Sequence, residues 1–422
     1  QAGSKLIQQK KSYMNLLIIL KNNIIENKVK FFLTIFLLSL LSRSIIAYYY
    51  GDRTLENEWS ILVNNLYNFG VFSLLRFGDL FVPNLWMPPI YGYFIYLHTI
   101  FFGIGQSLVI SVIISQIIIS SFTPIIFYKI TSTFFNKNLS LIGALIFSLF
   151  PIIVFSASQI SSVTIYLFLL LIFFYFFLEF CSSQAYRLAV LIAAISGILI
   201  LTRRDFVLIY FFSIFFSYFF FKVNLKKILF IIMITIITIS PYLIKNYLVF
   251  DKIIIHSGFG YNVWKAYNPN AKAEGYYIQS DDLKIKLDKI EKNVFYRINE
   301  DKVYLTKAKH YIKDEPSKYF KLFLNRIFSY YFIDLNSSQT NYFNQFHVIP
   351  NIVFAILSIA GIIVFNKKNF KYNYLILTMF LIIFIYSCFA ILPRYKIYIL
   401  PFQILLSLNL LEYFIEKLSK KN

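Results

Sequence analysis

Uninterrupted apolar runs, long enough to cross a membrane as helices, recur along the 422-residue chain and limit its possible folds. A helix needs about 20 apolar residues to span the hydrocarbon core of a bilayer, whereas a soluble core does not require such runs. The runs are continuous rather than alternating, which excludes a transmembrane β-barrel. Only 14% of the residues are charged and 58% are hydrophobic. The sequence therefore predicts an all-α polytopic membrane protein.

We expect ten or more spans, oriented by the basic residues between them. The ten are predicted at 31–50, 106–128, 139–157, 162–180, 188–202, 206–221, 228–245, 348–366, 372–392 and 397–414. Every short connection on the predicted inner side carries lysine or arginine, as the positive-inside rule requires of cytoplasmic loops. This distribution accounts for the net charge of +21 without a nucleic-acid partner, which we do not expect.

The same topology divides the chain into four segments. They are a cytoplasmic N-terminal segment with a possible tag remnant (1–30), an N-terminal transmembrane module (31–245), an extracytoplasmic loop domain (246–346), and C-terminal helices with a cytoplasmic tail (347–422). The second segment includes a first outer loop at 51–105, where we expect amphipathic juxtamembrane helices. Pro88 and Pro89 interrupt any helix in that loop.

Three carboxylates gather where the first span opens to the outside, in a chain with only 20 acidic residues. Asp52 and Glu56 are four residues apart and would share a helix face, while Glu58 points elsewhere. Acids in the first turn of a helix also oppose its positive dipole end, and this would explain them without chemistry. A carboxylate in this position is alternatively a general base for a hydroxyl acceptor.

Cationic residues occupy two other outer boundaries, against the positive-inside bias. Arg203 and Arg204 lie in "LTRRDF", and Arg394 and Lys396 lie in "LPRYKIYILP". Interfacial snorkelling is one explanation. Recognition of a phosphate is the other, because guanidinium groups bind phosphate through bidentate hydrogen bonds.

A third candidate region is the glycine- and tyrosine-rich stretch "GFGYNVWKAYNPNAKAEGYY" that opens the large outer loop. Its composition is typical of a structured loop with hydrogen-bonding and stacking capacity. The substrate-binding candidates here and in the first loop are Tyr91, His256, Tyr261, Asn262, Trp264 and Asn268. The four histidines lack metal-ligand spacing. We therefore expect no metal site and no required cofactor; a divalent cation is possible but not indicated.

The order of these motifs resembles the GT-C glycosyltransferases of the protein O-mannosyltransferase and lipid-A aminoarabinose transferase type, grouped as glycosyltransferase family 39. "ENEWSILVNNLYNFGVFS" is similar to the acidic first-loop motif, and "WMPPIYGYFIYLHTIFFG" to its continuation into the second span. "LTRRDF", the glycine-rich stretch and "RYKIYILP" resemble later blocks. The resemblance covers about 31–410. The aminoarabinose branch has a lysine where this chain has Met87, which argues against that activity.

The resemblance implies a GT-C fold and a polyprenyl-phosphate sugar as donor. Glu58 or Glu56, with Asp52 third, would deprotonate a hydroxyl acceptor on a glycolipid, glycan or protein. Arg203, Arg204 and Arg394, together with Lys396, would stabilise the leaving phosphate, and the sugar would be transferred with inversion. The expected location is a bacterial cytoplasmic membrane, with the active site on the periplasmic or extracellular side. A flippase or transporter of polyprenyl-linked glycans is the main alternative; a polymerase or ligase and a structural protein are weaker ones.

Overall fold

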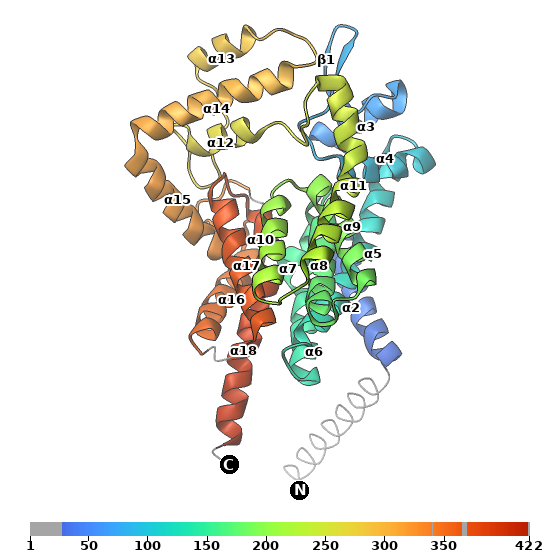
Figure 1. Ribbon diagram of the computed structural model, residues 1–422, viewed down its shortest axis with the longest axis vertical. Helices are drawn as coiled ribbons and strands as arrows, with labels where there is room; N and C mark the ends of the chain where they lie inside the picture. Colours follow the sequence, from blue (N-terminus) through green and yellow to red (C-terminus); the bar gives the residue numbers. More distant parts are fainter. Residues whose placement is uncertain (1–27, 340, 365–368, 421–422) are drawn as a thin grey trace.

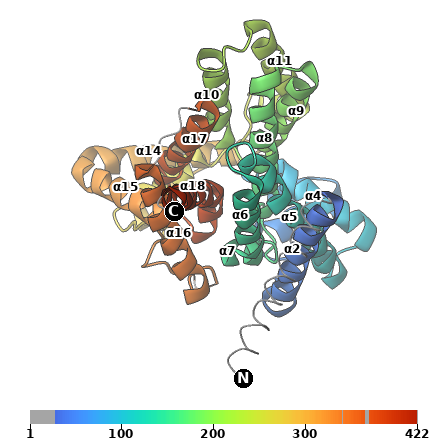
Figure 2. The same ribbon diagram turned by 90° about the horizontal axis from the view of Figure 1, so that it is seen from below.

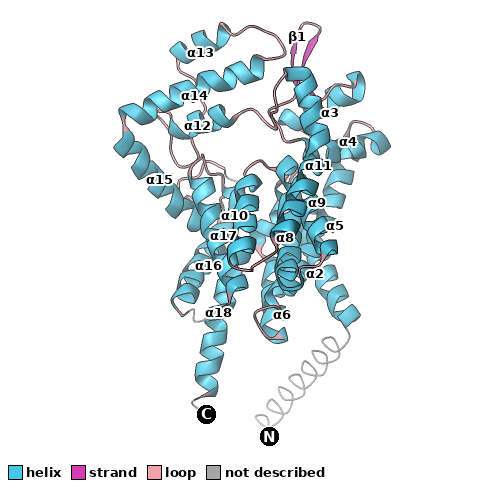
Figure 3. Cartoon of the chain, in the orientation of Figure 1, coloured by secondary structure: helices cyan, strands magenta, loops and turns pink. Residues whose placement is uncertain are grey.

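The computed structural model describes residues 28–339, 341–364 and 369–420, which are mostly helical (Figure 3). The first elements are α2 (Lys28–Tyr50), α3 (Asn57–Phe69), β1 (Ser73–Phe77), β2 (Leu80–Pro83), α4 (Pro89–Phe102), α5 (Gln106–Thr131), α6 (Lys137–Leu149) and α7 (Pro151–Ser156). Next come α8 (Val163–Ser183), α9 (Tyr186–Thr202), α10 (Phe206–Phe219) and α11 (Leu225–Phe250). The remainder are α12 (Phe259–Tyr267), α13 (Asp281–Asp288), α14 (Tyr296–Asp314), α15 (Pro316–Tyr331), α16 (Gln345–Ile363), α17 (Phe370–Ser387), the 3₁₀ helix η1 (Pro393–Tyr398) and α18 (Leu400–Ser419).

Six of the described helices are long and apolar enough to cross a membrane, namely α2, α5, α8, α11, α16 and α17. The ten spans expected from the sequence are therefore not confirmed. Helices α9 and α10 contain 17 and 14 residues, about 25 and 21 Å at 1.5 Å per residue, and a bilayer core is about 30 Å thick.

The other two differences have local causes. The span expected at 139–157 is divided into α6 and α7, because Pro151 follows the extended residue Phe150 and begins a new helix. The last expected span corresponds to α18, which continues to Ser419 and is not among the six described helices that fit a membrane span. Its second half carries Glu412, Glu416 and Lys417.

The long helices form a bundle with a layer of shorter elements over one end (Figure 1). Within the bundle α5 packs on α2 and α8, α9 packs on α8 and α11, and α16 packs on α18. Seen from below, α9, α10 and α11 lie on one side, α16 and α18 on a second, and α2 and α5 on a third (Figure 2). The start of α2 and the end of α18 lie at the end opposite the covering layer.

A buried arginine joins three helices inside the bundle. Arg43 of α2 is fully buried, and its Nε donates to the Ser120 hydroxyl of α5 at 2.7 Å. Its Nη1 donates to the Ser148 carbonyl of α6 at 3.0 Å and to Ser39 of its own helix. These bonds explain how a cation is accommodated in an otherwise apolar helix.

The first outer loop contains helices, as expected, namely α3 and α4, and one hairpin that we did not expect. α4 begins at Pro89, so the proline pair starts a helix, as prolines often do at the first position. Between the helices β1 and β2 pair antiparallel, with Phe77 opposite Leu80. The two-residue turn needs Gly78, whose φ is +58°.

The large outer loop folds into α12 to α15, a small helical layer with its own core. Trp264 of α12 packs with Leu283 of α13 and Tyr304 of α14. Arg326 of α15 is buried and donates to the carbonyls of Ala266, Lys272 and Ala273. This arginine fixes the chain that follows α12 and so holds α12 over the end of the bundle.

Candidate active site

A cavity of about 550 Å³ lies where the bundle meets the outer layer. Its walls come from the segment between α2 and α3, the residues before α4, the α7–α8 connection, the α9–α10 turn, the segment opening α12, and the chain between α17 and η1. The sequence-predicted residues that line it are Asp52, Glu56, Glu58, Arg203, Arg204, His256, Tyr261, Asn262 and Arg394. The fold thus brings the acidic cluster, both cationic boundaries and the glycine-rich stretch to one place.

The three acids occupy different environments. α3 begins at Asn57, so Asp52 precedes the helix, and the prediction that Asp52 and Glu56 share a helix face is wrong. Asp52 accepts a hydrogen bond from the Ile160 amide at 2.6 Å, and Glu56 accepts one from the Thr54 hydroxyl at 2.7 Å. Glu58 is exposed in the first turn of α3.

The pKa of the Asp52 carboxyl is raised, chiefly by burial and further by the nearby Glu56 charge, against the lowering effect of the Ile160 amide. The carboxylate is half-buried and held between two loops. Its proton affinity is therefore shifted toward the range in which a carboxylate accepts a proton at neutral pH.

Arg203 is enclosed by aromatic rings and paired with an acid. Its Nε donates to Asp205 at 3.1 Å, and its Nη1 donates to the Tyr398 hydroxyl at 3.2 Å. The guanidinium lies 4.6 to 5.5 Å from four tyrosine ring centres, those of Tyr166, Tyr386, Tyr395 and Tyr398. The Asp205 carboxylate offsets its charge, so this arginine offers less positive potential to a ligand than its neighbour.

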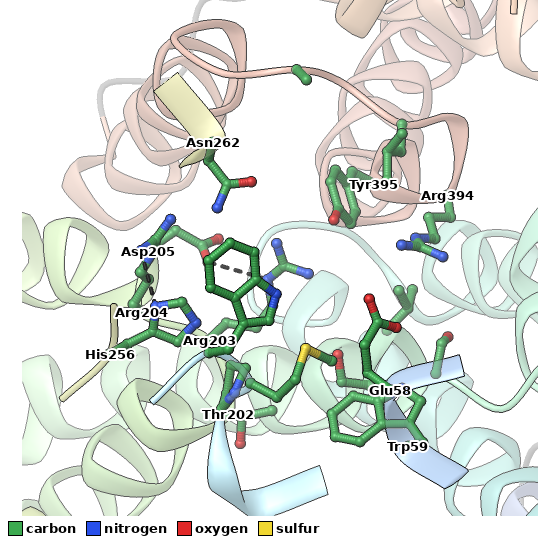
Figure 4. Close-up of a pocket in the computed structure, with 18 of the residues that line it drawn as sticks. Glu58, Trp59, Thr202, Arg203, Arg204, Asp205, His256, Asn262, Arg394 and Tyr395 are labelled. Carbon is green, nitrogen blue, oxygen red and sulfur yellow. Dashed lines mark hydrogen bonds and ion pairs between the residues drawn. The ribbon is translucent and has the colours of Figure 1, made fainter. Parts of the chain in front are cut away.

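Arg204 is held by an imidazole and a backbone carbonyl. Its Nη1 donates to Nδ1 of His256 at 3.0 Å, and its Nη2 to the Gly258 carbonyl at 3.3 Å (Figure 4). Burial and the Arg204 charge lower the pKa of His256 to about 3. The imidazole is therefore neutral at physiological pH, accepts from the arginine, and orients it toward the cavity.

Arg394 and Lys265 add two more cations. In the described part of the chain no ion pair involves Arg204, Lys265 or Arg394. Burial alone would raise the pKa of the Tyr395 hydroxyl, but the adjacent Arg394 and Arg203 lower it to about 8. A phenol that ionises this readily reports a strongly positive local potential.

The cavity is consequently bipolar. The Glu58 carboxylate, from α3, and the Arg394 guanidinium, from η1, project into the same space (Figure 4). Asp52, Glu56 and Glu58 form its acidic wall, and the cations without ion-pair partners belong to other segments. Such a cavity can take up a proton at one wall while negative charge develops at another.

Four predicted site residues lie outside the cavity lining. Lys396 is buried, and its Nζ donates to the Tyr330 and Tyr331 carbonyls at the end of α15. The other three are Tyr91, whose hydroxyl donates to Gln116 at 2.6 Å, Asn268, which donates to the Tyr276 carbonyl at 2.6 Å, and Trp264, which belongs to the core of the outer layer. Tyr91 still supports the site, since its ring packs 4.8 Å from that of Trp59 in the lining.

Several lining residues escaped the sequence prediction. Lys265 is one of two lysines in the glycine-rich stretch, and its position three residues after Asn262 on a helix was the available signal. Asp205 also lines the cavity, and its position directly after the arginine pair was the signal for it. Trp86 and Tyr395 lie within motifs that were identified, but nothing in their spacing indicated which way their side chains point.

No protein-family model and no curated protein matches this sequence. The structure resembles the Archaeoglobus fulgidus oligosaccharyltransferase in its apo form (TM-score 0.52, 12% identity, covering 92% of this chain and 51% of that one). It also resembles the same protein tethered with an acceptor peptide containing the NVT sequon (TM-score 0.55, 12% identity, 93% and 50%). ArnT from Cupriavidus metallidurans bound to undecaprenyl phosphate gives a TM-score of 0.40 at 11% identity, covering 91% and 77%.

This chain spans about half the length of the archaeal oligosaccharyltransferase that it matches. At 12% identity the likeness concerns the fold, which is of the GT-C type that the sequence motifs resembled.

Proposed function

We propose that this protein is a membrane glycosyltransferase that moves a sugar from a polyprenyl-phosphate donor to a hydroxyl group of a glycolipid, glycan or protein. The observation that carries this proposal is the bipolar cavity, with three carboxylates on one wall and, on others, three cations that form no ion pair with any described residue. The GT-C fold supports it, because such a fold places a site at the end of a helix bundle, where a lipid-linked donor can reach it.

The cations would bind the donor phosphate. Arg204 is oriented by His256 and the Gly258 carbonyl, while Arg394 and Lys265 lie on other segments of the same cavity. As the bond between the anomeric carbon and the phosphate oxygen breaks, negative charge develops on polyprenyl phosphate. Preorganised cations lower the barrier most where such charge appears.

Glu58 would act as the general base. Within the described residues no hydrogen bond holds its carboxylate, whereas Asp52 and Glu56 are held by Ile160 and Thr54. The acceptor hydroxyl would transfer its proton to Glu58, and its oxygen would form the new bond to the anomeric carbon with inversion. Asp52 would position the segment between α2 and α3, and its raised pKa makes it the second candidate base.

The site would face the periplasm or the exterior of a bacterial cytoplasmic membrane. The cavity lies at the end of the bundle opposite the start of α2, and basic residues such as Lys129, Lys137 and Lys226 lie at helix ends, next to connections away from it. The positive-inside rule places such connections in the cytoplasm.

A transfer assay tests the proposal. Purified protein would be incubated with native lipid extract and radiolabelled polyprenyl-phosphate sugars, and release of free polyprenyl phosphate would be followed. Glu58→Gln should lower kcat by about 10² to 10⁴, the usual contribution of a general base, with donor binding retained. Glu56→Gln should stay near the wild type. Asp79→Asn is the matched control, because Asp79 lies in the exposed hairpin turn outside the cavity.

Two outcomes would contradict this assignment. Equal rates for the wild type and all three carboxylate variants, Asp52→Asn included, would reduce the acidic cluster to a structural feature. Movement of the labelled lipid across vesicles without cleavage would favour a flippase.

A further inference from the structure

A second cavity, of about 280 Å³, adjoins the first and has no part in the proposed donor chemistry. It is lined by Glu58, Ile61, Leu74, Trp86, Tyr261, Arg297 and Glu300. Glu58, Trp86 and Tyr261 line both cavities, so the carboxylate proposed as base stands at their boundary. The remaining polar wall comes from α14, in the outer layer.

That wall carries a partly buried ion pair, whose Arg297 guanidinium also lies 5.0 Å from the ring centre of Trp86. Nη1 of Arg297 donates to Oε2 of Glu300 at 2.7 Å, and the two side chains are only 20% and 11% exposed. Oε1 of Glu300 and the other two guanidinium nitrogens of Arg297 form no hydrogen bond within the described residues. A fixed acceptor and fixed donors therefore face the cavity side by side.

Trp86 and Tyr261 form an aromatic wall of the same cavity. The rings of Trp86 and Tyr261 lie 4.9 Å apart at 59°. Burial raises the pKa of the Tyr261 hydroxyl, and the Glu58 and Glu300 charges raise it further. The hydroxyl is therefore protonated, and both carboxylates act on it electrostatically.

We propose that this second cavity binds one sugar ring of the acceptor and presents a ring hydroxyl to Glu58. Aromatic side chains accept the apolar face of a pyranose ring. The Arg297–Glu300 pair and the Tyr261 hydroxyl together offer donors and acceptors for neighbouring ring hydroxyls. This inference rests on the proposed function and narrows the acceptor to a carbohydrate.

The size and polarity of the second cavity favour a sugar over a peptide or a lipid chain as its ligand. The cavity lies just below the range of about 300 to 1,000 Å³ that holds drug-sized ligands, so it suits one ring rather than a folded peptide segment. A lipid chain would desolvate the Arg297–Glu300 pair and leave its remaining oxygen and nitrogens without hydrogen-bond partners, which is costly.

Binding of benzyl glycosides to the full-length protein, without donor, tests the inference. A panel of benzyl glucoside, galactoside, mannoside and N-acetylglucosaminide would be titrated against tryptophan fluorescence, since Trp86 lines the cavity. We expect saturable binding of at least one glycoside, weakened at least tenfold by Glu300→Gln and by Tyr261→Phe. Glu291→Gln and Tyr67→Phe are the matched controls, because both residues are exposed and outside the cavity.

The melting temperature of each variant would be compared with that of the wild type, to check that α14 is intact. Arg297→Lys would provide a second variant, which keeps the positive charge. Saturable binding that the variants lose supports the inference even if no transfer is ever detected. No saturable binding across the panel, or equal weakening by the controls, would overturn it. Saturable binding of a threonine-containing peptide instead would assign the cavity to a protein acceptor.

Transfer kinetics separate this inference from the proposed function. We expect Glu300→Gln to raise the acceptor KM at least tenfold, while cleavage of the donor by water stays within twofold of the wild type. Unchanged acceptor KM together with normal donor cleavage would overturn the acceptor subsite and leave the transferase proposal standing.

Discussion

The Nε of Arg203 donates a hydrogen bond to the Asp205 carboxylate at 3.1 Å, and this pairing distinguishes two arginines that are adjacent in the sequence. Asp205 also accepts from the Tyr386 hydroxyl, so the Arg203 charge belongs to a packed network. Arg204 points to His256 and has no ion-pair partner in the described part of the chain. One arginine serves mainly the structure, and the other is available to a ligand.

The two arginines should therefore respond differently to substitution. Arg204→Lys keeps a charge but loses its fork of hydrogen bonds, so we expect the donor KM to rise about tenfold with unchanged thermal stability. Arg203→Gln leaves Asp205 without its cation and should cost about 3 kcal/mol of folding free energy. Donor kinetics and chemical unfolding measure the two effects. An unchanged donor KM in Arg204→Lys would contradict this division.

Donor binding should weaken at alkaline pH because of Tyr395. Arg394 and Arg203 outweigh the effect of burial and lower the pKa of this hydroxyl to about 8. Below that pH the neutral phenol leaves the guanidinium charges available; above it, the phenolate neutralises them and repels a phosphate. We expect the donor KM to rise by about tenfold per pH unit above pH 8.

Tyr395→Phe should remove that alkaline limb and leave a flat profile between pH 7 and 9.5. A matched Tyr67→Phe variant, changed on the exposed face of α3, should keep it. Persistence of the limb in Tyr395→Phe would assign it to another group.

Lys396 should matter for stability rather than for the donor. Its buried Nζ binds the carbonyls at the end of α15, including that of Tyr330 at 3.3 Å. Lys396→Met should lower the free energy of unfolding by about 1 to 3 kcal/mol, since these buried carbonyls lose their donor. The donor KM should remain unchanged. Lys417→Met, at an exposed position of α18, is the control for charge removal. A raised donor KM at equal stability would restore Lys396 to the phosphate site.

A single methyl group at Gly260 should disturb both cavities. A Cβ there would lie 2.0 Å from the Asp301 carbonyl oxygen and 2.8 Å from Cβ of Leu305, so α12 and α14 would have to move apart. Gly260→Ala should lose transfer activity and lower the melting temperature. Gly143→Ala is the comparison, because its Cβ would meet the end of the flexible Leu408 side chain. Equal effects of the two substitutions would show that α12 does not hold the site.

Chelation should leave transfer intact. The described residues include no group of three or more His, Cys, Asp or Glu side chains placed to hold a metal ion, and the proposed mechanism uses cationic side chains instead. The rate in excess EDTA should stay within twofold of the untreated rate. A loss that Mg²⁺ or Mn²⁺ restores would require a metal in the reaction.

The sequence predicts the long helices well, because their apolar runs leave no other structure in a membrane. α2, α5, α8 and α11 begin and end within a few residues of the predicted limits. The short elements were harder to predict from the sequence. Pro151 indicated a helix break, but the apolar residues on both sides of it favoured one continuous span. Gly78 and Asp79 form a two-residue turn, and the strands on either side are too short to show an alternating pattern.

The site was predictable to the level of segments and not of side chains. Topology alone brings the end of α2, the α9–α10 turn and η1 to one end of the bundle. Arg394 and Lys396 are two residues apart in a 3₁₀ helix and point to different surroundings, one into the cavity and one to α15. No periodicity in the sequence distinguishes them, because packing against α15 decides it.

Arg43 has a consequence for how the chain is made. A lone arginine at the centre of a membrane helix costs about 2.5 to 3.5 kcal/mol on insertion scales, and α2 emerges from the ribosome before α5 and α6 exist. One of its hydrogen-bond acceptors, the Ser148 carbonyl, is translated 105 residues later. During that interval Arg43 lacks its hydrogen-bond acceptors on α5 and α6, which makes insertion of α2 less favourable. We therefore expect α2 to be fully stabilised in the bilayer only after α6 has been translated, when the three helices meet.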